Sequence, residues 1–215
     1  MAEAIKLEMA EGTFDTAAEE RKNVIRLKKP YSFEGVKYQE IDLSGLDKLT
    51  IQDAIDVQRK LFGERETASV VLCETTTAFA REIAAKATGM PIEFFKLAPR
   101  GLSKRIAATI QGHISVDRGM ENQVMKLKVP YQFKGMTYEE INLSGVADLN
   151  SLHESEVENR LAREGFIITD NGTNYLYACC IASMATGQPE DFFTCLPLAE
   201  LVTLRTAVND TSFFE

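Results

Sequence analysis

The residue types that most often carry out catalysis or bind metals are few in this chain, and their spacing matches no common type of site. The two histidines, His113 and His153, have no second histidine or cysteine at the spacing that zinc sites use. Cys179 and Cys180 are adjacent, without the two-residue gap of a redox or zinc pair. The glycines are isolated, so no phosphate-binding loop is predicted. We therefore expect no catalytic, cofactor-binding or metal-binding residue, and a protein that is not an enzyme.

Carboxylates are dense at one place, where Glu154, Glu156 and Glu158 fall within five residues. Such a run is typical of a solvated helix face. A hydrolase site would need acids that converge from separate elements, and a sequence does not show convergence. A small-ligand-binding protein or an enzyme therefore stays an alternative hypothesis, with its pocket expected between the two copies described next.

The chain contains a tandem duplication. Residues 24–49 (VIRLKKPYSFEGVKYQEIDLSGLDKL) align without a gap with residues 124–149 (VMKLKVPYQFKGMTYEEINLSGVADL), and 14 of the 26 positions are identical. A second block, ATGMPIEFF at 87–95, matches ATGQPEDFF at 185–193 with an offset of 98. Matched blocks in the same order and at nearly the same spacing indicate that a unit of roughly 90 residues has been duplicated.

The repeat defines the expected domain organisation. We predict a flexible N-terminal tail (1–22), repeat unit 1 (23–114), a linker (115–122) and repeat unit 2 (123–215). In each unit a strand-like pattern comes first and helical periodicity follows, without alternation of strands and helices. The predicted fold class is therefore α+β, with each unit a β-hairpin followed by three to four α-helices.

The first unit illustrates the predicted hairpin. Strands are expected over Val24–Lys28 and Val36–Leu43, separated by a longer loop at Pro30–Gly35. The apolar alternation slips at Gln39–Glu40, which predicts a bulge there. Gly35 is expected to adopt a positive φ in the turn.

Helix start and stop signals recur in both units. Ser151–Glu154 is expected to form a capping box, and glycines are expected to end the helices. The predicted helices lie near 50–62, 73–88, 150–163 and 174–186, with a short helix after Pro91 and Pro189 and a last helix from Pro99 and Pro197.

The charge of the chain is uneven. The net charge is −8, yet residues 1–120 hold 18 Lys+Arg and 18 Asp+Glu, whereas residues 121–215 hold 6 and 14. The acidic second half would repel a phosphate backbone, so we expect no nucleic-acid partner. No run approaches the ~20 apolar residues of a membrane span, so no membrane association is expected.

The N-terminus and the cysteines bear on the compartment. The sequence MAEAIKLEMAEG has neither the apolar core nor the cleavage site of a secretory signal. Cys73 has no counterpart in the second unit, whereas a disulfide framework would be expected to duplicate with the unit. We expect reduced thiols in a cytosolic protein.

Repeated aromatic residues are the candidate partner-binding residues. Adjacent residues on a helix point about 100° apart, so one ring of each Phe-Phe pair is expected to be partly exposed and to bind a partner. Packing in the core is the alternative interpretation. The candidates are Phe94, Phe95, Phe192, Phe193, Tyr31 and Tyr131.

The repeated pattern resembles a known family, the small tail assembly chaperones of contractile-tailed bacteriophages. Those proteins open with a strand ending in Leu-Lys-x-Pro, continue with a Gly-x-x-Tyr turn and a second strand, and close with Thr-Gly-x-Pro and a helix. The matching residues are Leu27, Lys28, Pro30, Gly35, Tyr38, Ile41, Leu43, Thr88, Gly89 and Pro91, and again Leu127, Lys128, Pro130, Gly135, Tyr138, Ile141, Leu143, Thr186, Gly187 and Pro189. The resemblance covers nearly everything after residue 22.

Two features depart from that family. Its members are usually a single unit, whereas this chain has two. Their last helix often begins with an Asp after a leucine, whereas Arg100–Gly101 and Ala199–Glu200 occupy that region here.

The resemblance implies a non-enzymatic assembly factor of a phage or prophage. It would bind and solubilise the tape measure protein, a long helix-rich chain, and help to recruit tail-tube subunits. It would act in the host bacterial cytoplasm and be absent from the mature virion. A structural virion or scaffold protein built from the same duplicated module is the alternative, and self-association through hairpin edges also stays open.

Overall fold

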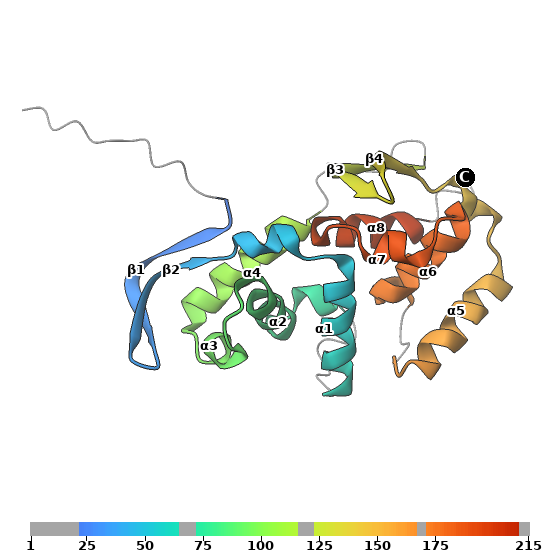
Figure 1. Ribbon diagram of the computed structural model, residues 1–215. Coiled ribbons are helices and arrows are strands. Elements are labelled where there is room, and N and C mark those ends of the chain that lie inside the picture. The colour runs from blue at the N-terminus through green and yellow to red at the C-terminus, as the bar shows by residue number, and fades with distance from the viewer. Residues whose placement is uncertain (1–21, 65–71, 116–122, 167–170, 211–215) are drawn as a thin grey trace, which may run out of the picture.

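The computed structural model describes residues 22–64, 72–115, 123–166 and 171–210 (Figure 1). Most of the expected tail and linker lies outside these residues. The first repeat comprises β1 (Val24–Phe33), β2 (Val36–Asp42), η1 (Ser44–Lys48), α1 (Ile51–Gly63), η3 (Cys73–Thr75), α2 (Thr77–Thr88), α3 (Ile92–Lys96) and α4 (Arg100–Ile114). The second comprises β3 (Val124–Phe133), β4 (Met136–Asn142), η4 (Ser144–Asp148), α5 (Ser151–Arg163), η5 (Asn171–Thr173), α6 (Tyr175–Thr186), α7 (Glu190–Thr194), η6 (Leu198–Glu200) and α8 (Leu201–Val208).

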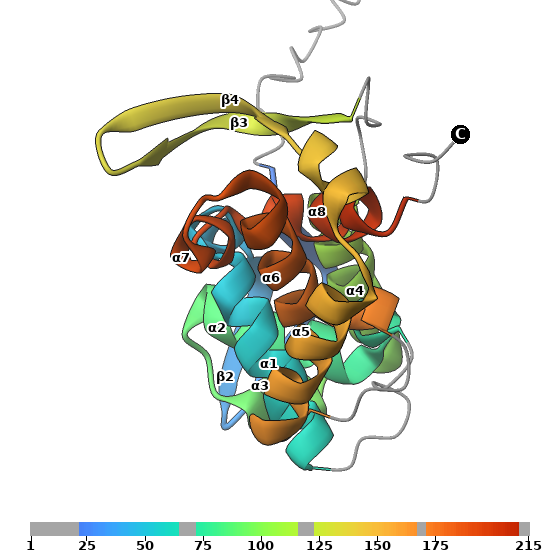
Figure 2. The ribbon, with the colours of Figure 1, turned by 90° about the vertical axis from the view of Figure 1, so that its right-hand side faces the viewer.

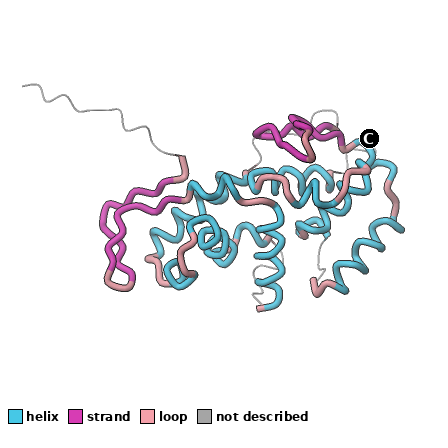
Figure 3. The backbone as a smooth tube through the Cα atoms, in the orientation of Figure 1, coloured by secondary structure: helices cyan, strands magenta, loops and turns pink. Residues whose placement is uncertain are grey.

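The predicted fold class is confirmed. Each repeat is α+β, with an antiparallel hairpin followed by helices, and within the described residues the strands are confined to the two hairpins (Figure 3). Figure 2 shows the second hairpin along one end of the helical body, with α7 and α8 beneath it.

The hairpin turn is tighter than predicted. Phe33 pairs with Val36, so the loop consists of Glu34 and Gly35 alone, with φ of 48° and 80°. Two successive positive φ values define the turn that matches the twist of paired strands. The prediction of a longer loop at Pro30–Gly35 is wrong, because β1 continues through Pro30, which lies in an irregular part of the strand.

That irregularity lies at the level of the predicted bulge, but its extra residues belong to β1. Arg26 pairs with Glu40 and Tyr31 pairs with Tyr38, so residues 27–30 of β1 lie opposite Gln39 alone. Pro30 lacks an N–H and is tolerated where the ladder is interrupted. The same shift recurs in β3, where residues 127–130 lie opposite Glu139 alone.

The helices follow the predicted positions closely. Gly89 and Gly187 end α2 and α6 with φ of 70°, as expected of glycine caps. The predicted box at Ser151–Glu154 is wrong by one residue. Asn150 caps α5, and its N–H donates to Nδ1 of His153 at 3.1 Å. This bond gives His153 a structural role.

A repeated glycine sets the distance between η1 and α2. A Cβ on Gly45 would lie 1.9 Å from the carbonyl oxygen of Ala87, and one on Gly145 would lie 2.0 Å from that of Ala185. Real Cβ atoms do not approach a backbone oxygen so closely. The Ser-Gly pair after each hairpin is therefore repeated because only glycine permits this contact.

The two repeats pack head to tail, with α1 of the first against α6, α7 and η6 of the second (Figure 1). The Ile51 N–H donates to the Leu196 carbonyl at 2.9 Å, and the Leu198 N–H donates to the Leu49 carbonyl at 2.8 Å. These bonds join the start of α1 to the segment before α8 as a short antiparallel bridge.

Polar groups are also buried in this interface. Gln58 is 1% exposed; its Nε2 donates to the Thr173 carbonyl at 2.9 Å, and its Oε1 accepts the Tyr175 N–H at 3.1 Å. The Tyr175 hydroxyl donates to Glu74 at 2.7 Å, and Arg205 forms an ion pair with the same carboxylate. Both partners of each bond are satisfied, which is the condition for burying them without a large cost.

The face of α1 that packs on the second repeat is lost in α5. Ile51, Ile55 and Phe62 are buried, whereas the equivalent Ser151, Ser155 and Ala162 are exposed. Figure 1 shows α5 at the outer side of the molecule. The other face is kept, since Val157 and Leu161 are buried like Val57 and Leu61.

The outer surface of the first repeat, at the other end of the molecule from α5, is also more polar than the equivalent surface of the second repeat. Thr77 and Arg100 of the first repeat are exposed, where Tyr175 and Leu198 of the second receive α1. Polar outer faces are what end a stack of repeats and keep it soluble. The acidic residues of α5 therefore account for part of the charge imbalance between the two halves.

The cysteines predict a selective labelling pattern. Cys195 is exposed, while Cys73, Cys179 and Cys180 are buried. Burial, with Glu190 nearby, raises the pKa of Cys180 to about 12, and thiols react as thiolates. We expect maleimide to modify one thiol quickly in the native chain and the other three only in denaturant, as counted by mass spectrometry. Rapid native labelling of Cys179 would contradict the packing of α6.

Candidate functional surfaces

The six candidate aromatic residues are packing residues. Phe94 and Phe95 are each 1% exposed, and Phe192 and Phe193 are 1% and 0%. Tyr31 and Tyr131 are 8% exposed. The expectation that one ring of each pair is partly exposed is wrong, and the core interpretation is confirmed.

The hairpin is the reason for this burial. The hairpin packs over the first ring of each Phe-Phe pair. The Phe94 ring lies edge-on to the rings of Tyr31 and Tyr38, and its centroid is 4.9 Å from each of theirs. The Tyr31 hydroxyl donates to the Phe94 carbonyl at 2.9 Å. In the second repeat Phe192 has the same place against Tyr131, at 5.3 Å. The rings hold each hairpin to its short helix.

An apolar groove lies beside this cluster in the first repeat, between the irregular segment of β1 and the start of α4. Its volume is about 650 Å³. We call it the Leu102 groove; its lining residues are Arg26, Leu27, Lys28, Lys29, Pro30, Tyr31, Pro99, Gly101, Leu102 and Arg105. The wall therefore includes one of the predicted partner-binding residues, Tyr31.

The Leu102 groove combines an apolar floor with a basic rim. Leu27, Pro30 and Leu102 supply apolar surface, and the described residues that line it include four cations and no carboxylate. Arg26, Lys28, Lys29 and Arg105 are exposed. Arg105 also donates to the Arg26 carbonyl at 2.6 Å, which ties α4 to the hairpin. Such a groove suits an apolar helix stripe with acidic flanks.

The sequence patterns do not predict this groove. The Leu-Lys-x-Pro motif is visible in the sequence, but the groove depends on the four residues of β1 that face one residue of β2. The matched helix position, Leu102, is apolar in the first repeat and Glu200 in the second. That difference between the copies was the available signal.

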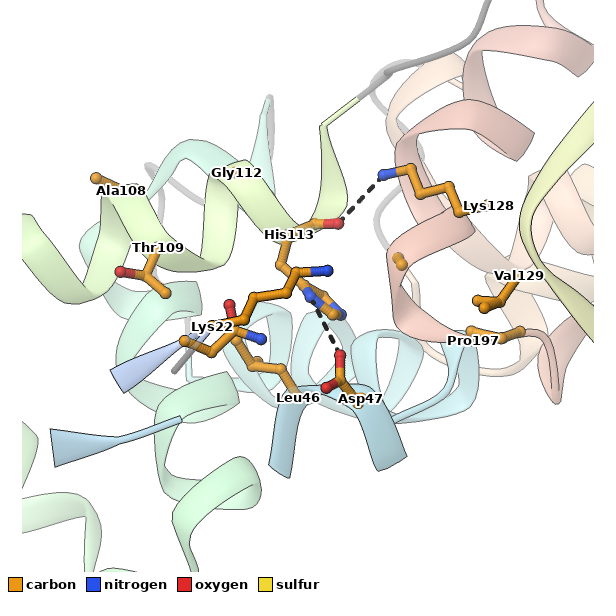
Figure 4. A pocket seen from close by; sticks show the side chains of 12 residues that line it. Lys22, Leu46, Asp47, Ala108, Thr109, Gly112, His113, Lys128, Val129 and Pro197 are labelled. Atoms are coloured by element: carbon orange, nitrogen blue, oxygen red, sulfur yellow. Dashed lines mark hydrogen bonds and ion pairs between the residues drawn. The ribbon is translucent and has the colours of Figure 1, made fainter. Parts of the chain in front are cut away.

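A second cavity of about 660 Å³ lies between the repeats, where a ligand pocket was expected (Figure 4). Lys22, Asp47, His113 and Lys128 are among its lining residues. The distance from His113 Nδ1 to Asp47 Oδ1 is 3.8 Å, which is too long for the hydrogen bond of a catalytic dyad. Burial lowers the pKa of His113, which favours the neutral imidazole.

The other polar groups of this cavity serve packing. Lys128 Nζ donates to the carbonyls of His113 and Ser115, where it satisfies the end of α4. The Thr109 hydroxyl donates to the Arg105 carbonyl at 3.0 Å. The polar side chains around this cavity therefore hold the structure together. None of the described lining residues is placed as an activated nucleophile.

The described part of the chain contains no group of three or more His, Cys, Asp or Glu side chains placed to hold a metal ion. A helix with the length and hydropathy of a membrane span is also absent from the described residues.

Comparison with known proteins gives no match for this chain, whether with family models, with characterised proteins or with solved structures.

Proposed function

We propose that this protein is a non-enzymatic phage tail assembly chaperone that binds the tape measure protein and keeps it in solution. The observation that carries the proposal is the Leu102 groove, an apolar floor with four exposed cations around it. A long helical chain exposes apolar stripes until it assembles, and a groove that buries such a stripe prevents its aggregation. The duplicated hairpin-and-helix unit is the pattern that resembles tail assembly chaperones.

The proposed role has consequences for place and partners. The chaperone would act in the host bacterial cytoplasm, help to recruit tail-tube subunits to the tape measure protein, and be absent from the finished virion. Because α1 packs on the second repeat, the two repeats would present one continuous body to the client, the protein that the chaperone keeps in solution.

Co-expression tests the proposal. The chain would be produced with the long coiled-coil protein encoded beside it, and the soluble fraction would be analysed by gel and affinity purification. The expected result is that the long protein is insoluble alone, but soluble and co-purified with this chain. If it stays insoluble in the presence of this chain, the chaperone proposal fails.

One observation favours a structural scaffold protein as the second candidate. Within the described residues each sheet has two strands, so each of these strands is an edge strand. The hairpin tips carry Val36 and Met136, which are 52% and 58% exposed. Exposed edges can pair with further copies. A scaffold would remain in purified particles, whereas a chaperone would not, so mass spectrometry of the particles separates the two.

A further inference from the structure

The two repeats differ at the position of the Leu102 groove. In the second repeat Glu200 replaces Leu102; it is 0% exposed, and its Oε1 accepts the Lys128 N–H at 2.6 Å. This bond ties the Leu-Lys-x-Pro segment of β3 to η6. Leu127 is accordingly 5% exposed, whereas Leu27 is only partly buried. The second hairpin is thus bonded to η6 at the place where the first repeat has the groove.

The cations differ as well. Lys29 and Arg105 of the first repeat correspond to Val129 and Thr203 of the second. Lys128, the counterpart of exposed Lys28, directs its ammonium to the carbonyls that end α4. With the net charge of −8 in residues 121–215, the second repeat repels the acidic flanks that the Leu102 groove attracts.

From these differences we propose that only the first repeat receives the client segment, and that this segment is a helix whose apolar stripe is flanked by Asp and Glu. The inference rests on the proposed function and names the partner chemistry of the same site. Charge complementarity identifies the occupant, since four cations surround the apolar floor. The second repeat supports the first through the α1 interface and takes no client segment in its own hairpin.

The test uses two synthetic peptides and the full chain. Both are labelled helical peptides of about 18 residues with the same leucine stripe, one flanked by glutamates and the other by lysines. Fluorescence anisotropy would measure binding at low and high salt. We expect the glutamate peptide to bind at least tenfold more tightly than the lysine peptide, and its affinity to fall with added salt. Equal binding of both peptides would overturn the charge assignment.

Three variants locate the site. Leu102→Glu copies the residue that the second repeat already accommodates, and Arg26→Glu reverses an exposed charge on the rim. Each is expected to weaken binding of the glutamate peptide at least tenfold. Lys126→Glu is the matched control at the equivalent exposed position of the second repeat, and we expect less than a twofold change. Equal losses from Arg26→Glu and Lys126→Glu would overturn the division between repeats, and circular dichroism checks folding.

Co-expression separates failure of this inference from failure of the proposed function. If the wild-type chain solubilises the tape measure protein and the Leu102→Glu and Arg26→Glu variants do so equally well, the groove assignment is wrong and the function stands. If the wild-type chain does not solubilise it, the proposed function is wrong, whatever the peptides do.

Discussion

Replacement of Gly45 by alanine is expected to lower the free energy of unfolding by about 3 kcal/mol. The new Cβ would lie 1.9 Å from the Ala87 carbonyl oxygen, and the atom in its way belongs to the backbone of α2, which does not move aside like a flexible side chain. Relief requires η1 and α2 to separate, which also disturbs the hairpin that precedes η1. Urea unfolding followed by circular dichroism measures the loss.

The second repeat provides an internal replicate, and α1 provides a control. Gly145→Ala is expected to cost a similar amount, because its Cβ would lie 2.0 Å from the Ala185 carbonyl oxygen. Gly63→Ala meets nothing within 4 Å, so we expect stability to be unchanged or to rise by up to about 1 kcal/mol. A Gly45→Ala chain as stable as the Gly63→Ala chain would show that η1 and α2 are not in this contact.

Replacement of Gln58 by alanine is expected to cost about 2–4 kcal/mol, because it strips hydrogen bonds from two buried backbone groups of the other repeat. The amide is 1% exposed and bonds the Thr173 carbonyl and the Tyr175 N–H. Thr173 ends η5 and Tyr175 begins α6, so loss of the two hydrogen bonds weakens the packing of α1 on the second repeat. Thermal unfolding by circular dichroism gives the effect.

Gln52→Ala is the matched control in the same helix. Gln52 is only partly buried and bonds Asp56 within α1 at 2.9 Å. Its loss is expected to change stability by less than about 0.5 kcal/mol. If the two substitutions cost the same, the head-to-tail contact contributes little to the stability of the chain.

The parts of the fold that could be predicted are those that the repeats share. The hairpin, the glycine caps at Gly89 and Gly187, and the helix positions recur in both copies and depend on local chemistry. The sequence predicts a longer turn because a proline such as Pro30 is typical of a strand end, whereas in the structure a strand irregularity accommodates it. Burial of Phe94 depends on how the hairpin packs against α3, and such a tertiary contact is not encoded in the local sequence pattern.

The head-to-tail packing could not be predicted from the repeat, because it depends on positions at which the copies differ. Ile51 faces the second repeat, while its counterpart Ser151 faces solvent. Leu198 is buried in the contact between η6 and α1, while its counterpart Arg100 is exposed. A comparison that looks for identity between the copies passes over these residues. The Leu102 groove was missed for the same reason, since Glu200 stands at its counterpart.

The packing also explains why two units occur in one chain. A unit with an apolar α1 face needs a partner to cover it, and the second repeat provides that cover while its own α5 is polar. The duplication therefore yields a stack of two with polar outer faces. Within that stack the copies have diverged, one with an open groove and one with a buried glutamate.

Site-specific photocrosslinking tests the central claim most directly. Benzoylphenylalanine would replace Lys29 on the rim of the Leu102 groove or, in a second chain, the equivalent exposed Val129. Each chain would be co-expressed with the long coiled-coil protein and irradiated. We expect a crosslink to the long protein from position 29 and little or none from position 129. A crosslink from position 129 alone would contradict it.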